Sequence, residues 1–180
     1  MSHKFIKKLS LSTGLYRQAR IAYRLWGRAE KSRYLSDIRH YSQLLPNTSA
    51  LCFDVGANTG RITEVLLELG HSVVAFEPQL ECIREMTARC NPSKNRLRVK
   101  NCAVGDSAGE ATLFVREWNG RSSLRQAWEG EISCTKKVPV CTLDNAIQEF
   151  GIPQYCKIDV EGWRPPPPPP NRSPVLLGRQ

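Results

Sequence analysis

The sequence lacks several features that would define a protein class directly. Its apolar runs fall short of the roughly 18 residues of a membrane-spanning helix, so we expect no such helix. Its seven cysteines form no CxxC pair and its three histidines are isolated, which argues against a zinc site. No secretory apolar segment stands near the N-terminus. We therefore expect a cytoplasmic protein with reduced thiols and no bound metal.

Acidic residues are scarce at both ends of the chain. The formal net charge is +9, from 26 Lys and Arg and 17 Asp and Glu among 180 residues. Residues 1–48 hold ten basic and two acidic side chains, and residues 163–180 hold three arginines and no acid. Residues 49–162 are therefore slightly acidic. Because the positive charge lies outside this middle part, we expect a domain that does not bind nucleic acid.

The two basic ends differ in their sequence patterns. Residues 1–48 have helical periodicity, with a basic stripe opposite an apolar one and a second apolar stripe further on. The basic stripe is Arg17, Arg20, Arg24, Arg28 and Lys31, and the apolar stripes are Leu15, Ala19, Ala22 and Trp26, then Tyr34, Ile38, Tyr41 and Leu45. We expect this arm to dock on the following domain. The alternative is that residues 11–31 lie on an anionic membrane or bind a partner. Residues 163–180 contain six consecutive prolines and predict a disordered tail.

Between these ends, apolar strands alternate with amphipathic helices. We predict strands at 51–55, 72–76, 97–104 and 155–160, helices at 61–69, 79–90 and 143–150, and two partly exposed strands around 111–115 and 138–140. This alternation predicts an α/β fold with a doubly wound, mostly parallel sheet and helices on both faces. Cys52, Cys102 and Cys156 lie in predicted strands, where we expect them to pack as small apolar side chains.

The first strand runs into a glycine-containing turn, Asp54-x-Gly56-x-x-x-Gly60. Glycine lets the backbone approach a ligand closely, and the N-terminus of the next helix offers free N–H groups. Glu77 ends the second strand, 21 residues after Gly56, where a carboxylate can accept both hydroxyls of a ribose. This combination predicts a cofactor that contains adenosine.

Two common nucleotide motifs do not fit this turn. A dinucleotide fingerprint G-x-G-x-x-G would require its first glycine where Asp54 stands, and no G-x-x-x-x-G-K-[ST] sequence is present. A carboxylate at the end of the first strand suits a cationic ligand, such as a sulfonium with an ammonium group, better than a pyrophosphate.

Six segments resemble, in order and spacing, the FkbM-type S-adenosylmethionine-dependent methyltransferases. They are DVGANTG (54–60), AFEP (75–78), NCAVGDSAGEATLFV (101–115), SSL (122–124), VCTLDNAI (140–147) and KIDVEG (157–162). The resemblance covers about residues 50–162. It implies a class I methyltransferase fold and transfer of a methyl group from S-adenosylmethionine. The implied acceptor is a hydroxyl oxygen of a sugar, polyketide or related small molecule or glycan.

The resemblance also implies roles for individual residues. Asp54, Gly56, Asn58 and Gly60 would hold the amino-acid end and the sulfonium neighbourhood of the cofactor, Glu77 the ribose, and Ala103 and Val104 the adenine. Asp159 would face the methyl group and the acceptor, and Glu161, in the same turn, would be a catalytic base or a group that orients the acceptor. Alternatives remain open here, since Glu77 could be a surface acid, Asp159 could cap the next element, and Arg121 could contact the acceptor or water.

The resemblance stops after KIDVEG. The family continues with a helix and further strands, whereas Trp163, Arg164 and the proline run follow here. The implied strand order is 3-2-1-4, which leaves the 155–160 strand at an edge. We therefore expect a truncated family member with weak or no activity. The alternatives are a non-catalytic cofactor-binding fragment, completed by another chain at the open sheet edge, and a peripheral membrane or partner-binding protein that acts through its basic helix.

Overall fold

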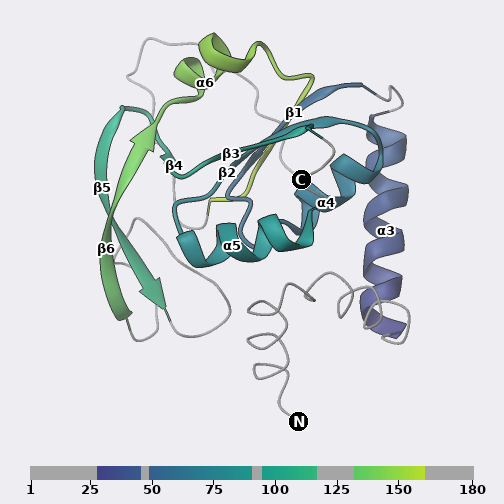
Figure 1. Ribbon diagram of the computed structural model, residues 1–180, viewed down its shortest axis with the longest axis horizontal. Helices are drawn as coiled ribbons and strands as arrows, with labels where there is room; N and C mark the ends of the chain where they lie inside the picture. Colours follow the sequence, from purple (N-terminus) through teal and green to yellow (C-terminus); the bar gives the residue numbers. More distant parts are fainter. Residues whose placement is uncertain (1–27, 46–48, 91–94, 117–131, 161–180) are drawn as a thin grey trace, which may run out of the picture.

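The computed structural model describes residues 28–45, 49–90, 95–116 and 132–160 of the chain (Figure 1). Several sequence predictions concern residues outside this part: the first apolar stripe, most of the basic stripe, Arg121, Glu161 and the proline-rich tail. The described part has an α/β fold with a main parallel sheet and a smaller second sheet, as the strand–helix alternation predicts.

Four parallel strands form the main sheet in the order β3-β2-β1-β7. They are β1 (Leu51–Val55), β2 (Ser72–Phe76), β3 (Leu97–Lys100) and β7 (Tyr155–Ile158). This order confirms the expected 3-2-1-4 arrangement. Because β2 and β7 flank β1 on opposite sides, the winding reverses between β1 and β7, and sheets of this kind bind ligands at the carboxyl ends of the strands at such a point.

Helices cover both faces of the main sheet (Figure 1). They are α3 (Arg28–Leu44), α4 (Arg61–Glu68), α5 (Leu80–Arg89) and α6 (Leu143–Phe150). Successive strand residues point to opposite faces, so Cys52 packs in the core beneath α3, α4 and α5, while Phe53 and Val55 pack in the core beneath α6. Burial on both faces explains why β1 and β2 read as almost continuous apolar runs.

Helix α3 docks through its apolar stripe, as predicted for these residues. Tyr41 is buried in the core, and Tyr34, Ile38 and Leu45 pack against it. The Tyr41 ring meets the ring of Tyr155 on β7 edge to face, with 5.8 Å between ring centroids. At the start of α6, the Thr142 side chain accepts a hydrogen bond from the backbone N–H of Asn145 and caps the helix.

The single strand predicted at 97–104 is wrong, because this segment divides between two sheets. β3 ends at Lys100, and residues 103–104 form β4 (Ala103–Val104), which pairs with β6 in the second sheet. The side-chain amide of Asn101 donates to the carbonyl oxygens of Glu77 at 3.1 Å and Pro78 at 2.9 Å. These bonds hold residue 101 against the end of β2, at the point where the chain leaves the main sheet.

The second sheet has the order β4-β6-β5. β5 (Gly109–Arg116) and β6 (Ile132–Cys141) are antiparallel and contain the two partly exposed strands that were predicted, at greater length. β7 ends at Ile158, two residues before its predicted end, because its partner β1 ends at Val55 opposite Ile158.

Within the described residues, none of the helices combines the length and apolar character needed to span a membrane. The same residues contain no group of three or more metal-binding side chains close together.

Candidate active site

The turn after β1 lies against the end of β7. Gly56 has a φ of +70°, a left-handed conformation that favours glycine. A Cβ atom added at Gly56 would lie 2.2 Å from the backbone oxygen of Asp159. Only a residue without a side chain fits there, so Gly56 holds the turn after β1 and the Asp159 segment in direct contact.

Hydrogen bonds inside the protein occupy the backbone N–H groups of this turn. Those of Gly56 and Ala57 both donate to the carbonyl oxygen of Phe76 at 3.0 Å, and that of Gly60 donates to Ala57 at 2.9 Å. A Cβ atom at Gly60 would lie 2.4 Å from Met86 Cγ on α5. The close approach that the two glycines permit is therefore, in this structure, an approach to other parts of the protein.

Glu77 follows β2 and is only 4% exposed. Its Oε2 accepts a hydrogen bond from the Asn58 N–H at 2.8 Å, and its Oε1 accepts one from the Gln79 N–H at 2.9 Å. Burial raises the pKa of this carboxyl, and the two N–H donors offset part of that rise. The surface-acid alternative is wrong for Glu77, whose carboxylate is fixed in place and retains acceptor capacity for further donors.

Asp54 is fully buried, and both of its carboxylate oxygens have partners. Oδ2 accepts a hydrogen bond from the Thr63 hydroxyl at 2.7 Å, and Oδ1 lies 3.1 Å from Lys157 Nζ. The lysine also donates to the Gly56 carbonyl oxygen at 3.2 Å and lies 3.5 Å from Asp159 Oδ2. The ammonium of Lys157 thus joins the end of β1 to the end of β7.

Lys157 and Thr63 were not among the predicted site residues. One sequence signal could have suggested Lys157, since a lysine inside the apolar segment YCKI needs a buried or half-buried partner. No local signal marks Thr63, which lies on a helix face and meets Asp54 only in the fold.

Asp159 differs from Asp54, because its side chain is 69% exposed. Its backbone N–H donates to the carbonyl oxygen of Val55 at 3.0 Å, which places the carboxylate at the carboxyl end of the sheet. The structure therefore brings together five predicted residues at the carboxyl ends of the strands of the main sheet: Asp54, Gly56, Asn58, Glu77 and Asp159. Glu161, the second predicted catalytic residue, lies outside the described part of the chain.

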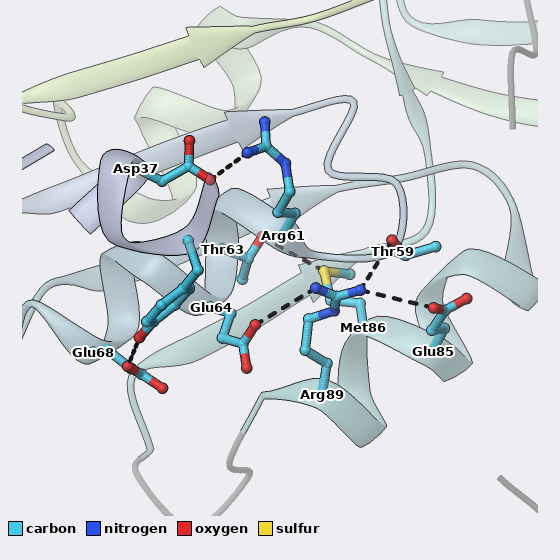
Figure 2. Close-up of polar contacts among 10 residues, drawn as sticks. Asp37, Thr59, Arg61, Thr63, Glu64, Glu68, Glu85, Met86 and Arg89 are labelled. Carbon is cyan, nitrogen blue, oxygen red and sulfur yellow. Dashed lines mark hydrogen bonds and ion pairs between the residues drawn. The ribbon is translucent and has the colours of Figure 1, made fainter. Parts of the chain in front are cut away.

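A buried cluster of charged side chains on α4 and α5 contacts the turn after β1 (Figure 2). Arg89 of α5 is 8% exposed, and its guanidinium lies 3.5 Å from Glu64 Oε2 and 3.8 Å from Glu85 Oε1. The same guanidinium donates to the Thr59 hydroxyl at 3.5 Å. This contact connects α5 to the residue next to Asn58, so the position of the turn depends on two helices as well as on β1.

A pocket of about 170 Å³ opens beside the same strand ends. Its lining residues come from the ends of β1, β4 and β7 and from the start of α6: Val55, Val104, Gly105, Asp106, Thr142, Leu143, Asp144, Ile158 and Val160. Val104 is among these lining residues, whereas Ala103 packs in the core of the second sheet. The carboxylates of Asp106 and Asp144 were not predicted as site residues.

Comparison with protein families agrees with this geometry. The family described as the methyltransferase FkbM domain matches residues 54–163, which is more than half of the chain. The chain belongs to this family. No curated protein and no solved structure matches it. In this FkbM-domain methyltransferase the matched segment begins at Asp54 and includes Glu77, Lys157 and Asp159, so the site at the strand ends lies within the family domain.

Proposed function

We propose that this FkbM-domain methyltransferase binds S-adenosylmethionine at the carboxyl ends of β1, β2 and β4 and methylates a hydroxyl oxygen. The acceptor we propose is a sugar, a polyketide or a related small molecule or glycan. The observation that carries the proposal is the buried carboxylate of Glu77, held by two backbone N–H groups at the end of β2. A carboxylate at this position can accept both hydroxyls of a ribose.

The other residues fit the remaining parts of the cofactor. Val104, Leu143 and Val160 give the pocket apolar walls suited to the faces of a purine, and the Asp106 and Asp144 carboxylates can accept a hydrogen bond from an exocyclic amine. The carboxylates of Asp54, Glu77 and Asp159 lie around the turn with Lys157, which suits a ligand carrying positive charge.

When bound, S-adenosylmethionine supplies a methyl group activated by its sulfonium. The chain must then align an acceptor hydroxyl and remove its proton. We assign both roles to Asp159, and the support is that its carboxylate is exposed at the strand ends while its backbone is held against Val55 and Gly56. Lys157 holds this carboxylate from the protein side at 3.5 Å.

Calorimetric titration with S-adenosylmethionine tests the cofactor assignment. We expect the unaltered protein to bind, and Glu77→Gln to weaken binding at least about tenfold, because one charged acceptor of ribose hydrogen bonds is lost. Glu81→Gln is the matched control, since Glu81 is a solvent-exposed acid that pairs with Lys136 at 2.9 Å. Failure of the unaltered protein to bind would refute the cofactor, and equal binding by Glu77→Gln would remove Glu77 from the ribose role.

Transfer of radiolabelled methyl groups to a panel of sugars and hydroxylated polyketides tests the reaction. We expect Asp159→Asn to retain cofactor binding but to lower turnover about 100-fold or more, as loss of a general base does. Unchanged turnover in Asp159→Asn would assign the base to another residue.

A further inference from the structure

Two thiols meet beside the pocket without a role in the proposed reaction. Cys102 precedes β4, and Cys141 ends β6, the strand that pairs with β4. Their Sγ atoms lie 2.8 Å apart. A disulfide requires about 2.05 Å between the sulfurs, so the two atoms need to approach by less than about 1 Å.

The backbone holds this pair together independently of the thiols. Ala103 and Val104 pair in register with Val140 and Cys141, and the Gly105 N–H donates to the Cys141 carbonyl oxygen at 3.0 Å. The Cys141 thiol lies 3.6 Å from the Ala103 carbonyl oxygen. A cross-link would therefore form between segments that are already fixed side by side.

The two thiols differ in access. Cys102 is 6% exposed and is therefore shielded from an oxidant in solution. Cys141 is half-buried and is the thiol that a small oxidant reaches first. The order of events follows from this difference, since the more accessible sulfur reacts with the oxidant and its neighbour then resolves it.

We propose that Cys102 and Cys141 form a redox modification site that closes a disulfide with a peroxide as oxidant. The Cys141 sulfur attacks the peroxide, an S–O bond forms, the O–O bond breaks and, with hydrogen peroxide, water leaves. The Cys102 sulfur then attacks the Cys141 sulfur, the S–S bond forms, and the oxygen leaves as a second water with the Cys102 proton. Two electrons pass from the thiols to the peroxide.

The cross-link would join two walls of the pocket. Val104 to Asp106 follow Cys102 closely, and Thr142 to Asp144 follow Cys141 directly. Fixing both segments stiffens the pocket, and closing a loop that spans the β5–β6 hairpin restricts the unfolded chain. The cross-link itself does not depend on the proposed function, but its effect on S-adenosylmethionine binding rests on it.

The test is treatment of the reduced full chain with hydrogen peroxide, followed by peptide mapping by mass spectrometry without reductant. We expect a Cys102–Cys141 peptide two hydrogens lighter than the reduced pair, a Tm increase of about 5–10 °C, and reversal by dithiothreitol. Cys102→Ser and Cys141→Ser should show neither effect. Cys134→Ser, which alters an exposed thiol, should show both.

Further oxidation of Cys141 without a cross-link, or a disulfide between other cysteines, would overturn the proposal. Calorimetry then compares oxidised and reduced protein, and we expect the affinity for S-adenosylmethionine to change at least about threefold. An unchanged affinity would overturn the coupling to the pocket. If the reduced protein does not bind S-adenosylmethionine, the proposed function fails, while peptide mapping and Tm still decide the cross-link.

Discussion

The ends of β1 and β7 lie side by side but differ in burial. The end of β1 is buried, and we call it the closed side; the end of β7 is exposed to solvent, and we call it the open side. After β1, Asp54 has no exposed surface, and Gly56 and Gly60 leave no room for a Cβ atom. At the end of β7, the Asp159 side chain is 69% exposed and Ile158 is 49% exposed. Packing therefore preforms the side where we propose the cofactor, and leaves accessible the side where we propose the acceptor.

This difference has a physical basis in Lys157, which contacts both sides. Its ion pair with Asp54 compensates a buried charge, which would otherwise be costly. Its contact with Asp159 is made at the surface, where water screens the interaction and its contribution to stability is small. One ammonium group thus stabilises the fold on one side and orients an exposed carboxylate on the other.

Gly56→Ala should have the largest effect on the closed side. The added Cβ would meet the Asp159 oxygen at 2.2 Å with φ at +70°, so we expect a loss of about 4 kcal/mol in the free energy of unfolding. Urea unfolding followed by circular dichroism measures it. Gly109→Ala is the control, because its φ is also positive but no atom lies within 4 Å of the added Cβ. Equal losses in the two variants would show that the contact with Asp159 is unimportant.

Asp54→Asn and Asp159→Asn compare the two carboxylates directly. We expect Asp54→Asn to lower the free energy of unfolding by about 3 kcal/mol, because Lys157 loses its buried partner. We expect Asp159→Asn to change it by less than about 0.5 kcal/mol, since this side chain is exposed. The same urea titration serves both. Similar values for both variants would contradict the distinction between a closed and an open side.

The pH dependence of cofactor binding should report on Glu77. Because burial raises its pKa above the ordinary 4.5, Glu77 protonates at a higher pH than an exposed glutamate, and binding of S-adenosylmethionine should weaken as the pH falls through that range. The stability effect has the opposite sign. The folded state holds this proton over a range where the unfolded state has lost it, so the contribution of Glu77 to stability decreases as pH rises.

The pH trend of cofactor binding is measured by calorimetry and that of stability by urea unfolding. Both are measured across acidic pH on the unaltered protein and on Glu77→Gln. The difference between the two proteins isolates Glu77 from the other carboxylates. A binding difference that does not depend on pH in this range would place the ribose contact elsewhere.

Thiol labelling should give the smallest perturbation, and it reports on the closed side. Burial raises the pKa of Cys90, in the core beneath the closed turn, to about 12, and that of Cys52 to about 11. Both thiols should stay protonated and unlabelled by iodoacetamide at pH 8 until the protein unfolds. Exposed Cys134 should react first. Labelling of Cys90 in folded protein at the rate of Cys134 would show that the closed side opens readily.

Much of the main sheet could be predicted from the sequence. The segments that form β1 and β2 are short apolar runs bounded by turn residues, and their burial on both faces produces this local signal. The division of segment 97–104 into two strands could not be predicted, because its apolar residues continue past Lys100. The segment divides into β3 and β4 because β3 pairs with β2 and β4 pairs with β6, while Asn101 between them binds the carbonyl oxygens of Glu77 and Pro78.

The candidate site likewise contains residues that the sequence could predict and residues that it could not. Asp54, Gly56, Gly60 and Glu77 could be predicted because strand ends and glycine turns have local sequence patterns. The pocket residues Asp106 and Asp144 could not, since nothing near them in the sequence indicates that the start of α6 reaches the end of β4.

The sequence by itself determined the α/β fold class, the strand order through its family resemblance, and the acid at the end of β2. Apolar periodicity, glycine turns and motif spacing are local, so they survive without coordinates. Only the tertiary structure decided that Asp54 is held by Thr63 and Lys157, that Asp159 remains open, and that Cys102 meets Cys141. The contacts of Asp54 with Lys157 and of Cys102 with Cys141 join residues far apart along the chain, which only the pairing of distant strands brings together.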